Sequence, residues 1–573
     1  MKERTEALSI LLINLFYPER HPTIGFPVNV ESLAGDLAAE FGDSVDVSVL
    51  DMQQPGVTVD KILRTVRDKH FDVVGVSVKT GQREIAESIL DGVLDLPIQH
   101  QPRYLMVGGY RPRVYHEEFA EKYPHPKVVV CIGEGEPTMR GMVSHLRGGI
   151  PITEVPNLVF MTSQGLQRTV RRQHDLTTWH SPGTSTLPLI LEAGGVVYLE
   201  TSRGCSWGKC TFCSRKFSSG TKPSTIPPEK IAQSWAEFRR LGVQEVYCSD
   251  EDFMMNSHAH GRALGEALIE ANVQMRFWVQ TTVDGVLQLG RASYTADNDG
   301  TAGRRLPMLD IEAPLVGVDP VGRFDGKGTL AILRKAGLSR IFFGLESGSA
   351  SQLIRYRKGV TASEGARAVQ LCREVGFEVE VGFIPLDPLV TTDELRETVE
   401  YIRAHNLAQS TVKILNLMCV QNGVAMFAQT KEAGLITGER DVDTFLYPYA
   451  FANPRAGQIA EWVHQWQRHG LSEFTYALRR VVDADPSHPI STQFLFELRQ
   501  LEFEFLAMLV EQNPEKDETT YDQCMQRRFN IMQRCMNAVA NEWMPDPTNF
   551  LAKAFEESKA WMQESETADV LRL

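Results

Sequence analysis

Short apolar runs alternate with amphipathic segments of helix length through roughly the first four hundred residues of this chain. The first series of such runs lies at 8–15, 45–50, 73–78, 104–107 and 128–132. Strands that are joined through helices run parallel, and parallel strands are buried on both faces. The pattern therefore predicts a doubly wound, Rossmann-like α/β domain with a ligand crevice at the carboxyl edge of its sheet.

A second series of apolar runs begins after residue 195. Strands are expected at 196–200, 244–252, 276–280, 339–349 and 378–384, with a closing strand at 411–420. Helical stretches such as 228–241 and 363–375 separate them, which predicts parallel strands in a partial β/α barrel. The chemistry of such barrels gathers at the carboxyl ends of the strands.

The length of 573 residues allows three domains with sizeable cores. We expect the α/β domain at 1–150, a connector with a small hairpin at 151–195, the barrel at 196–405 and a mainly helical C-terminal domain at 406–573. Amphipathic helices are expected in the last domain at 459–469, 471–483, 494–511 and 524–544. A polar, glycine-rich insertion at about 289–324 interrupts the barrel, and we expect it to help shape the substrate entrance.

Three cysteines, Cys205, Cys210 and Cys213, follow the first barrel strand within RGCSWGKCTFC at 203–213. Three thiolates can hold one 4Fe-4S cluster and leave one iron open to a substrate or cofactor. A structural zinc site would need a fourth Cys or His, and no His lies between residues 181 and 256. Disulfides are disfavoured because the nine cysteines are an odd number and mostly scattered. The spacing favours the cluster, with zinc and inert thiols as the alternatives.

This stretch resembles the radical S-adenosylmethionine (SAM) enzymes, whose usual signature is C-x3-C-x2-C after the first barrel strand. The first gap here is one residue longer, and Gly208 can absorb the extra turn. The resemblance implies a partial (β/α)6 barrel of the TIM type, with SAM on the open iron. The residues that it implies as SAM contacts are Asp250, Asp252, Gln280, Glu346, Ser347, Gly382 and Ile384. For the three acidic residues, solvated strand-end carboxylates are the alternative.

The loops at the carboxyl edge of the first sheet are rich in glycine, but none is the G-x-G-x-x-G dinucleotide motif. Such a sheet before a radical SAM domain resembles the cobalamin-binding radical SAM family. The cobalamin contacts that this resemblance implies are Ser77, Lys79, Thr80, Gln82, Gly108, Gly109, Tyr110, Gly133, Glu134, Gly135 and Glu136. The single Asp-x-His sequence, at 68–70, lacks the glycine of a D-x-H-x-x-G loop. We therefore expect methylcobalamin without a histidine lower ligand, and the 79–82 loop beneath cobalt.

The resemblance implies a cobalamin-dependent radical SAM C-methyltransferase. It would move a methyl group from SAM via methylcobalamin to a carbon of a small natural-product intermediate, amino acid or peptide, and an electron donor such as flavodoxin or ferredoxin would supply electrons. One alternative is a related enzyme that catalyses rearrangement, cyclisation or polar methylation, and another is a non-catalytic corrinoid-binding regulator. Tyr447 and Tyr449 are candidates for substrate contact in the C-terminal cap, although core packing explains most aromatic residues there.

The overall composition excludes several other classes of protein. A formal net charge of -14 argues against a nucleic-acid partner. The sequence has neither an apolar stretch long enough to span a membrane nor the pattern of a signal peptide. Free cysteines and an oxygen-sensitive cluster point to the reducing cytoplasm.

Overall fold

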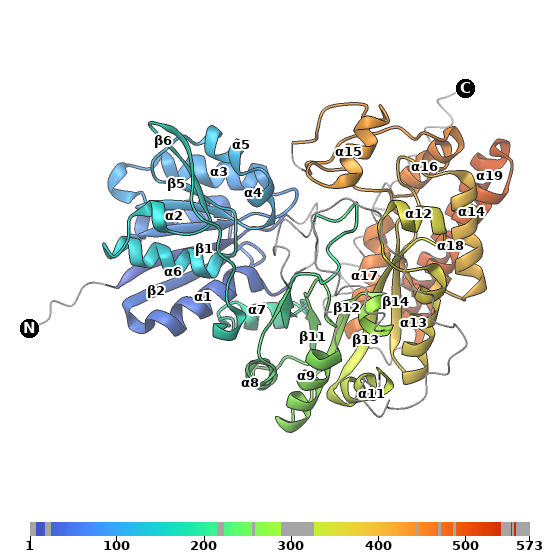
Figure 1. The fold of residues 1–573 in the computed structure, drawn as a ribbon, viewed down its shortest axis with the longest axis horizontal. Coiled ribbons are helices and arrows are strands. Elements are labelled where there is room, and N and C mark those ends of the chain that lie inside the picture. Colours follow the sequence, from blue (N-terminus) through green and yellow to red (C-terminus); the bar gives the residue numbers. More distant parts are fainter. Residues whose placement is uncertain are drawn as a thin grey trace, which may run out of the picture.

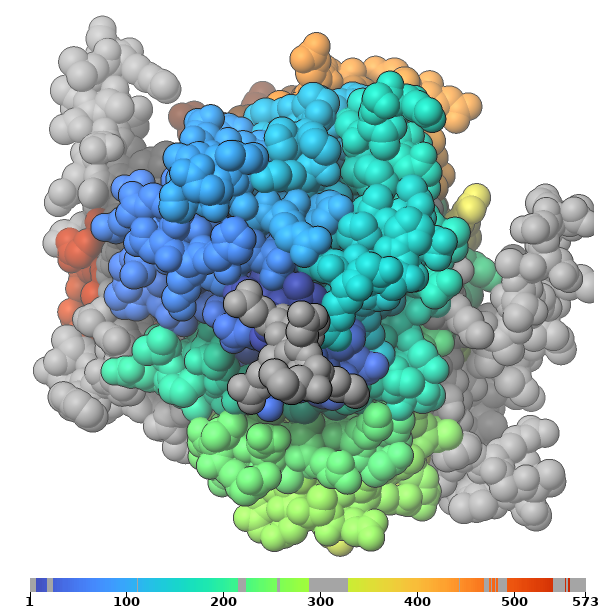
Figure 2. Space-filling view, turned by 90° about the vertical axis from the view of Figure 1, so that its left-hand side faces the viewer, coloured from blue at the N-terminus to red at the C-terminus, as the bar shows by residue number. Residues whose placement is uncertain are grey.

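The computed structural model describes residues 7–17, 24–214, 223–254, 258–287, 326–442, 444–467, 471–484, 489–539, 552 and 555–556. The N-terminal α/β unit lies on the left of Figure 1, the barrel in the lower centre and the C-terminal helices on the right. In Figure 2 the N-terminal unit faces the viewer, and the green surface of the barrel emerges below it. The insertion expected at 289–324 lies outside the described residues.

The N-terminal sheet confirms the expected doubly wound α/β architecture. Its parallel strands follow the order β2-β1-β3-β4-β5: β2 (Val45–Asp51), β1 (Leu8–Asn14), β3 (Val73–Ser77), β4 (Tyr104–Gly108) and β5 (Val128–Cys131). Leu11 and Ile13 face a core shared with α2 (Val59–Asp68) and α3 (Arg83–Leu94). Ile10 and Leu12 face a second core with α1 (Val28–Phe41) and α6 (Gly135–Leu146). Strands buried on both faces explain the nearly continuous apolar runs.

The hairpin expected in the connector extends this sheet. Strand β6 (Leu158–Thr162) pairs antiparallel with β5, and β7 (Gly165–Arg168) pairs antiparallel with β6. The sheet therefore runs past residue 150, where the sequence pattern placed the end of the first domain.

Six parallel strands form the partial barrel, as expected. Their order is β15 (Thr411–Lys413), β14 (Glu378–Phe383), β13 (Leu338–Glu346), β12 (Arg276–Thr281), β11 (Glu245–Cys248) and β8 (Tyr198–Leu199). The helices α8 (Pro228–Arg240), α9 (His258–Glu270), α11 (Gly326–Ala336), α13 (Ala362–Val375) and α14 (Thr392–Ala404) alternate with them. The closing strand is shorter than the expected 411–420, and it lies beyond residue 405, where the sequence pattern placed the end of the barrel domain.

Helices of the C-terminal unit pack beside the last strands of the barrel (Figure 1). They are α16 (Pro454–Gln467), α17 (Leu471–Ala484), α18 (Pro489–Glu511) and α19 (Asp517–Val539). Glu380 of β14 is buried and accepts hydrogen bonds from Arg479 of α17 and Arg499 of α18, each at 2.6 Å. This buried ionic contact fastens the helices to the barrel. Among the described residues, no helix is both long and apolar enough to cross a membrane.

Candidate functional site

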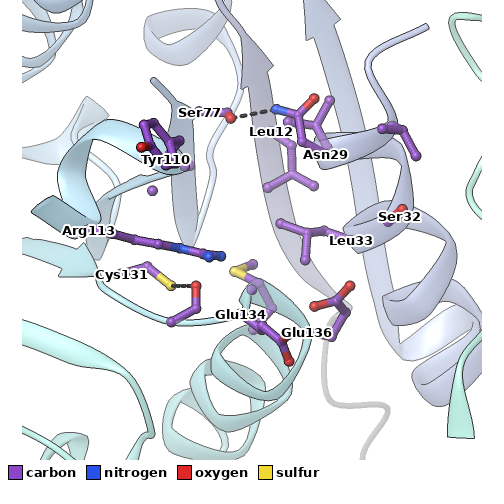
Figure 3. Close-up of a pocket in the computed structure, with 18 of the residues that line it drawn as sticks. Leu12, Asn29, Ser32, Leu33, Ser77, Tyr110, Arg113, Cys131, Glu134 and Glu136 are labelled. Carbon is purple, nitrogen blue, oxygen red and sulfur yellow. Dashed lines mark hydrogen bonds between the residues drawn. The ribbon is translucent and has the colours of Figure 1, made fainter. Parts of the chain in front are cut away.

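A cavity of about 360 Å³ lies at the carboxyl edge of the N-terminal sheet (Figure 3). Leu12, Met106 and Met139 form part of an apolar wall, and the loops after β4 and β5 border it. The barrel contributes Glu200, Ser202, Arg203, Ser249 and Glu251, which flank the cysteine loop. A crevice at the strand ends, where the strand order reverses, is the usual ligand site of an open α/β sheet. Here the barrel supplies one wall of that crevice.

Most of the expected cobalamin contacts line this cavity: Ser77, Gly108, Gly109, Tyr110, Gly133, Glu134, Gly135 and Glu136. The structure places Lys79, Thr80 and Gln82 outside its lining. Gln82 is buried, and its side chain joins two loops by accepting from the Lys79 amide at 2.9 Å and donating to the Leu15 carbonyl at 3.0 Å. Sequence reasoning missed Asn29, whose amide donates to Ser77 Oγ at 2.5 Å in the cavity.

Two glycines of the 133–136 loop are required by packing as well as by the cavity. A Cβ on Gly133 would lie 2.2 Å from the Asn157 side chain, and one on Gly135 would lie 2.7 Å from Leu33. Asn157 in turn donates to the Glu134 carbonyl at 3.2 Å. The glycine pattern therefore holds the loop close to the connector and to α1, which fixes the two carboxylates that it carries.

The carboxylates of Glu134 and Glu136 lie in the lower part of the cavity in Figure 3, and the Arg113 side chain extends across the cavity above them. Burial raises the pKa of Glu134. Burial acts in the same direction on Glu136, but the Arg203 guanidinium outweighs it and lowers the pKa of Glu136 to about 2. Glu136 is therefore ionised at neutral pH. Sequence reasoning gave no role to Arg113 or Arg203, although an acidic pair next to a buried loop was a signal for a nearby cation.

The three cysteines of the loop after β8 lie close enough for their charges to interact. Burial raises the pKa of Cys205 to about 11 and that of Cys210 to about 12. The Cys205 and Cys213 thiols both add to the rise at Cys210, so the three thiols are close enough to interact. Iron at this position would stabilise the thiolates, because a bound metal ion deprotonates its thiol ligands. Three neighbouring thiols on one loop supply three of the four iron ligands of a 4Fe-4S cluster and leave one iron open.

No group of three or more His, Cys, Asp or Glu side chains in the described part of the chain is arranged to hold a single metal ion. A 4Fe-4S cluster asks for a different arrangement, because each thiolate binds a different iron.

Hydrogen bonds to backbone carbonyls and a ring contact fix the cysteine loop to the segment after α12 (Ala350–Arg355). Trp207 Nε1 donates to the Arg357 carbonyl at 2.7 Å, and the Thr211 amide donates to the Tyr356 carbonyl at 3.0 Å. The ring of Phe212 packs edge-to-face on Tyr356, with the ring centroids 5.3 Å apart. The loop is therefore held by the far side of the barrel as well as by its own strand.

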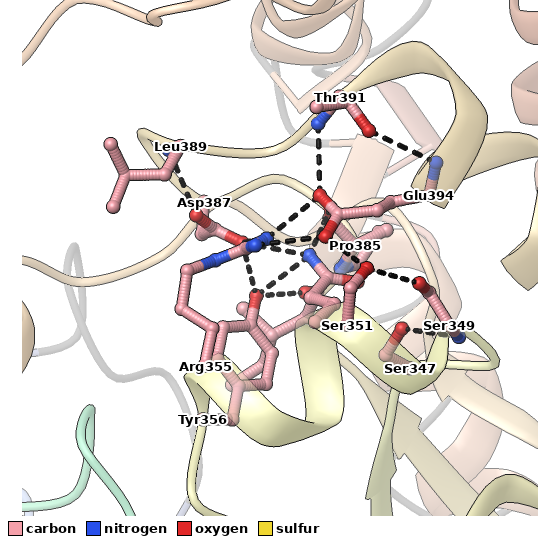
Figure 4. A network of polar contacts seen from close by, with 12 residues as sticks. Ser347, Ser349, Ser351, Arg355, Tyr356, Pro385, Asp387, Leu389, Thr391 and Glu394 are labelled. Carbon is pink, nitrogen blue, oxygen red and sulfur yellow. Dashed lines mark hydrogen bonds and ion pairs between the residues drawn. The ribbon is translucent and has the colours of Figure 1, made fainter.

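A buried polar network supports that segment (Figure 4). Arg355 forms ion pairs with Asp387 at 2.7 Å and with Glu394 at 2.8 Å. Tyr356 Oη donates to the Ile384 carbonyl at 2.7 Å, and Gln352 Nε2 donates to Asp387 at 2.8 Å. Glu394 also completes the capping box of α14 with Thr391. The network joins α12, the loop after β14 and α14 into one rigid support.

The structure places the expected SAM residues at the carboxyl ends of the barrel strands, and several are engaged by the protein itself. Asp250 accepts hydrogen bonds from the amides of Thr201 and Ser202 at 2.8 and 3.2 Å, and burial raises its pKa to about 7. Asp252 accepts from Ser206 in the cysteine loop and from Thr281, each at 2.8 Å. These carboxylates hold the loops after β8 and β12.

Glu346 is the most constrained of the expected SAM residues. It adopts a left-handed backbone conformation with φ of 69° and pairs with Lys358 at 2.9 Å. Strain of this kind in a residue other than glycine clusters at functional sites. Burial acts to lower the pKa of Lys358, but Glu346 outweighs it, and Cys210 adds to the resulting rise. The pair therefore lies beside the cysteine thiols.

The remaining expected SAM residues have neighbours within the protein. Gln280 donates to the Asp250 carbonyl, and the Ser347 hydroxyl lies 3.1 Å from that of Thr398. A Cβ on Gly382 would lie 2.7 Å from the Phe342 ring. The Ile384 amide donates to the Glu346 carbonyl at 2.8 Å. Among the residues that the sequence did not single out, Glu251 accepts from the Gly204 amide at 2.8 Å.

Tyr447 and Tyr449 join an apolar cluster that borders the cysteine loop through Phe212 and the end of β14 through Ile384. The hydroxyl of Tyr449 donates to the Met418 carbonyl at 3.0 Å, and burial raises its pKa. The ring of Tyr447 lies 4.7 Å from that of Phe427 in α15 (Ala425–Glu432).

The segment between α15 and α16, here called the strap (434–453), also contacts the N-terminal unit (Figure 1). The ring of Phe445 stacks on Tyr115 at a centroid distance of 3.6 Å. Arg440 pairs with Glu118 at 2.8 Å and lies over both rings. The strap therefore connects the barrel mouth to the α/β unit.

Comparisons with known proteins identify two families along the chain. The family model "Radical SAM superfamily" matches residues 199–402, and the model "B12 binding domain" matches residues 21–143. The 4'-phospho-dehydrooxetanocin synthase of Priestia megaterium is 26% identical over 430 residues, which is 72% of this chain and 53% of that protein. The hopanoid C-3 methylase of Methylococcus capsulatus is 22% identical over 305 residues, which is 52% of this chain and 50% of that protein. The chain spans about half the length of these two relatives.

The fold agrees with these matches. The structure of the cobalamin-dependent SAM radical enzyme OxsB with aqua-cobalamin and SAM bound superposes with a TM-score of 0.76 at 20% sequence identity. The match covers 97% of this chain and 84% of OxsB. The two domains imply a 4Fe-4S cluster, SAM and cobalamin as cofactors. The chain therefore contains a B12-binding domain followed by a radical SAM domain, and it shares its overall fold with OxsB.

Proposed function

We propose that this chain is a cobalamin-dependent radical SAM C-methyltransferase that acts on a carbon of a small natural-product intermediate, amino acid or peptide. The observation that carries the proposal is the shared cavity, because residues flanking the cysteine loop form one wall of the crevice in the B12-binding domain. A substrate between the two cofactors could then meet both of them. Holding reactants in this way supplies much of the rate gain in such reactions.

Different loops of the chain would bind the two cofactors. Cys205, Cys210 and Cys213 would hold the cluster, and the loops after β3, β4 and β5 would hold cobalamin without a histidine lower ligand. The position of the 68–70 segment supports the absence of a histidine ligand. This segment, which carries His70, lies at the exposed end of α2, outside the lining of the cavity. When bound, the cluster and SAM supply hydrogen abstraction from an unactivated carbon, and cobalamin supplies the methyl group.

The surroundings of the cysteine loop suit this chemistry. The apolar cluster that contains Phe212, Ile384, Tyr447 and Tyr449 would exclude water and form one side of the substrate site. The polar network around Arg355 would keep the cluster loop in place. An electron donor such as flavodoxin or ferredoxin would reduce the cluster.

A second candidate function is rearrangement or cyclisation of the substrate without net methyl transfer. The curated relative with the higher identity is named as a synthase of a phosphorylated product, and the OxsB fold extends over the C-terminal helices as well. These observations favour testing phosphorylated small molecules alongside amino acids and peptides.

Product analysis separates the candidates. The reconstituted full chain is incubated anaerobically with cobalamin, a reductant, substrate panels and SAM labelled in its methyl group. Radical methyl transfer yields 5'-deoxyadenosine, S-adenosylhomocysteine and a labelled product. Rearrangement yields 5'-deoxyadenosine without S-adenosylhomocysteine or label, and polar methylation yields S-adenosylhomocysteine alone.

The variant Cys213→Ala is the control for these assays. It should abolish SAM turnover while cobalamin binding persists, because Cys213 would bind the cluster and would not contact cobalamin. Unchanged SAM turnover in this variant would contradict the cluster assignment. A wild-type chain that binds cobalamin without consuming SAM would instead be a corrinoid-binding regulator.

A further inference from the structure

Arg203 lies two residues before the first cluster cysteine, in the short strand β9 (Ser202–Arg203). Its guanidinium group donates to both carboxylate oxygens of Glu136, at 2.6 and 3.2 Å, on the loop after β5. It also donates to both oxygens of Glu200, at 2.6 and 2.9 Å, just after β8. A third carboxylate, Glu134, lies 3.7 Å away. One side chain therefore joins the B12-binding domain to the radical SAM domain.

The chemistry of this contact favours a fixed geometry. The side chains of Arg203 and Glu136 are 14% and 7% exposed, so solvent screens the pair weakly. The planar guanidinium group offers its donors at fixed angles, and a bidentate pair fixes orientation as well as distance. Lysine would keep the charge but could not reproduce both pairs of hydrogen bonds.

Because Arg203 stands directly before the cysteine loop, its contact with Glu136 affects where that loop lies. Gly204, between Arg203 and Cys205, donates its amide to Glu251 at 2.8 Å and has a positive φ of 93°. Arg203, Glu136, Glu200 and Glu251 all line the cavity at the sheet edge. A shift of the Arg203 side chain would therefore move the cysteine loop relative to the 133–136 loop.

We propose that Arg203 is a positioning residue that sets the separation and orientation of the two cofactors by holding Glu136 and Glu200 on either side of one guanidinium group. The inference rests on the proposed function only in that the cluster and cobalamin bind at the two loops described. It does not depend on methyl transfer as the outcome. Arg203 acts through the loops and takes no part in the reaction itself.

The test compares Arg203→Lys with Arg140→Lys. Arg140 of α6 pairs in bidentate fashion with Asp36 of α1, at 2.8 and 2.5 Å, and both partners lie within the N-terminal unit. The control variant thus loses an ion pair of the same kind, but this pair lies within one domain. Both variants are reconstituted as full chains with the cluster and cobalamin.

The first readout is independent of turnover. Pulsed electron paramagnetic resonance measures the distance distribution between the reduced cluster and cob(II)alamin. We expect Arg203→Lys to shift or broaden this distribution while iron content and cobalamin binding stay at the wild-type level, and Arg140→Lys to leave it unchanged. A distribution in Arg203→Lys that matches the wild type would overturn the proposal.

The second readout is the ratio of substrate-derived product to 5'-deoxyadenosine. A small misplacement of reacting groups can cost on the order of 10²-fold in rate, so this ratio should fall strongly in Arg203→Lys and not in Arg140→Lys. A wild-type ratio in Arg203→Lys would also count against the proposal. If the wild type makes no methylated product, the methyltransferase function fails, but the spectroscopic distance still tests Arg203.

The variant Arg203→Gln/Glu136→Gln serves if Arg203→Lys does not fold. It removes the charges of Arg203 and Glu136 together, so no ionised Glu136 is left without its partner, and of the two paired carboxylates only Glu200 loses its cation. It should also change the cofactor distance, because one shorter amide side chain cannot reproduce the four hydrogen bonds that Arg203 donates to Glu136 and Glu200. A wild-type distance in this variant would refute the role of Arg203.

Discussion

Gly359 allows the sharpest test of how the cysteine loop is held. Its backbone is left-handed, with φ of 76°, and a Cβ at this position would lie 2.3 Å from the Trp207 ring of the cysteine loop. The variant Gly359→Ala therefore both strains the backbone and displaces the ring. Gly434 is the matched control, because its φ is 68° and a Cβ there would meet nothing within 4 Å.

The expected losses of stability come from the strained backbone and from the displaced Trp207 ring. Both alanine variants should lose about 1–2 kcal/mol to the left-handed conformation. Only Gly359→Ala should also lose the hydrogen bond from Trp207 Nε1 to the Arg357 carbonyl, which is 2.7 Å long. Such a bond contributes about 1 kcal/mol, which corresponds to roughly a fivefold loss of the ordered loop.

The assay is the rate at which reconstituted protein loses iron to a chelator under anaerobic conditions. We expect Gly359→Ala to lose iron several-fold faster than Gly434→Ala. The pair Gly359→Ala and Trp207→Ala should be non-additive, since once the ring is removed the new Cβ has nothing to displace. Equal rates of iron loss in the two alanine variants would refute the idea that Trp207 on Gly359 holds the loop.

Three further variants test other contacts of the site. Burial raises the pKa of Asp250 from 3.8 to about 7, so the folded protein loses stability as the pH rises through this range. The variant Asp250→Asn cannot titrate, so its unfolding midpoint should depend less on pH in this range. Parallel curves for the variant and the wild type would contradict the assignment. Arg355→Gln should destabilise the protein by about 3 kcal/mol in urea, because it leaves the fully buried Asp387 without its cation, whereas a loss below about 1 kcal/mol would contradict this. Arg440→Ala removes the partly exposed pair with Glu118 and the contacts with the Tyr115 and Phe445 rings, so it should cost about 1–2 kcal/mol. It should also speed limited proteolysis of the strap, and an unchanged cleavage rate would argue against the strap contact.

Much of the architecture could be predicted from the sequence because it depends on local patterns. Apolar runs of strand length, separated by amphipathic helices, predict parallel sheets whatever the details of packing. The six barrel strands and the order of domains followed from this pattern. The hairpin at 158–168 was also predicted, but its pairing with β5 was not, because an exposed hairpin and an edge pair have similar sequences.

The candidate site was predicted in part. The cysteine spacing and the glycine-rich strand ends are short-range signals, and both lie where the chain brings the sheet edge and the barrel mouth together. Other residues were predicted as ligand contacts, and the structure shows that they also form hydrogen bonds within the protein. Asp250 and Gln82 are examples, because a strand-end position does not reveal which neighbouring backbone group a side chain will meet.

The sequence by itself determined which segments become strands, where the three thiols lie along the chain and which loops are rich in glycine. The tertiary structure decided how those loops are joined. Arg203 meets Glu136 from 67 positions away, and Thr211 meets Arg355 from 144 positions away. Neither contact leaves a periodic or spacing signal, because its energy comes from burying complementary groups that only the folded chain brings together.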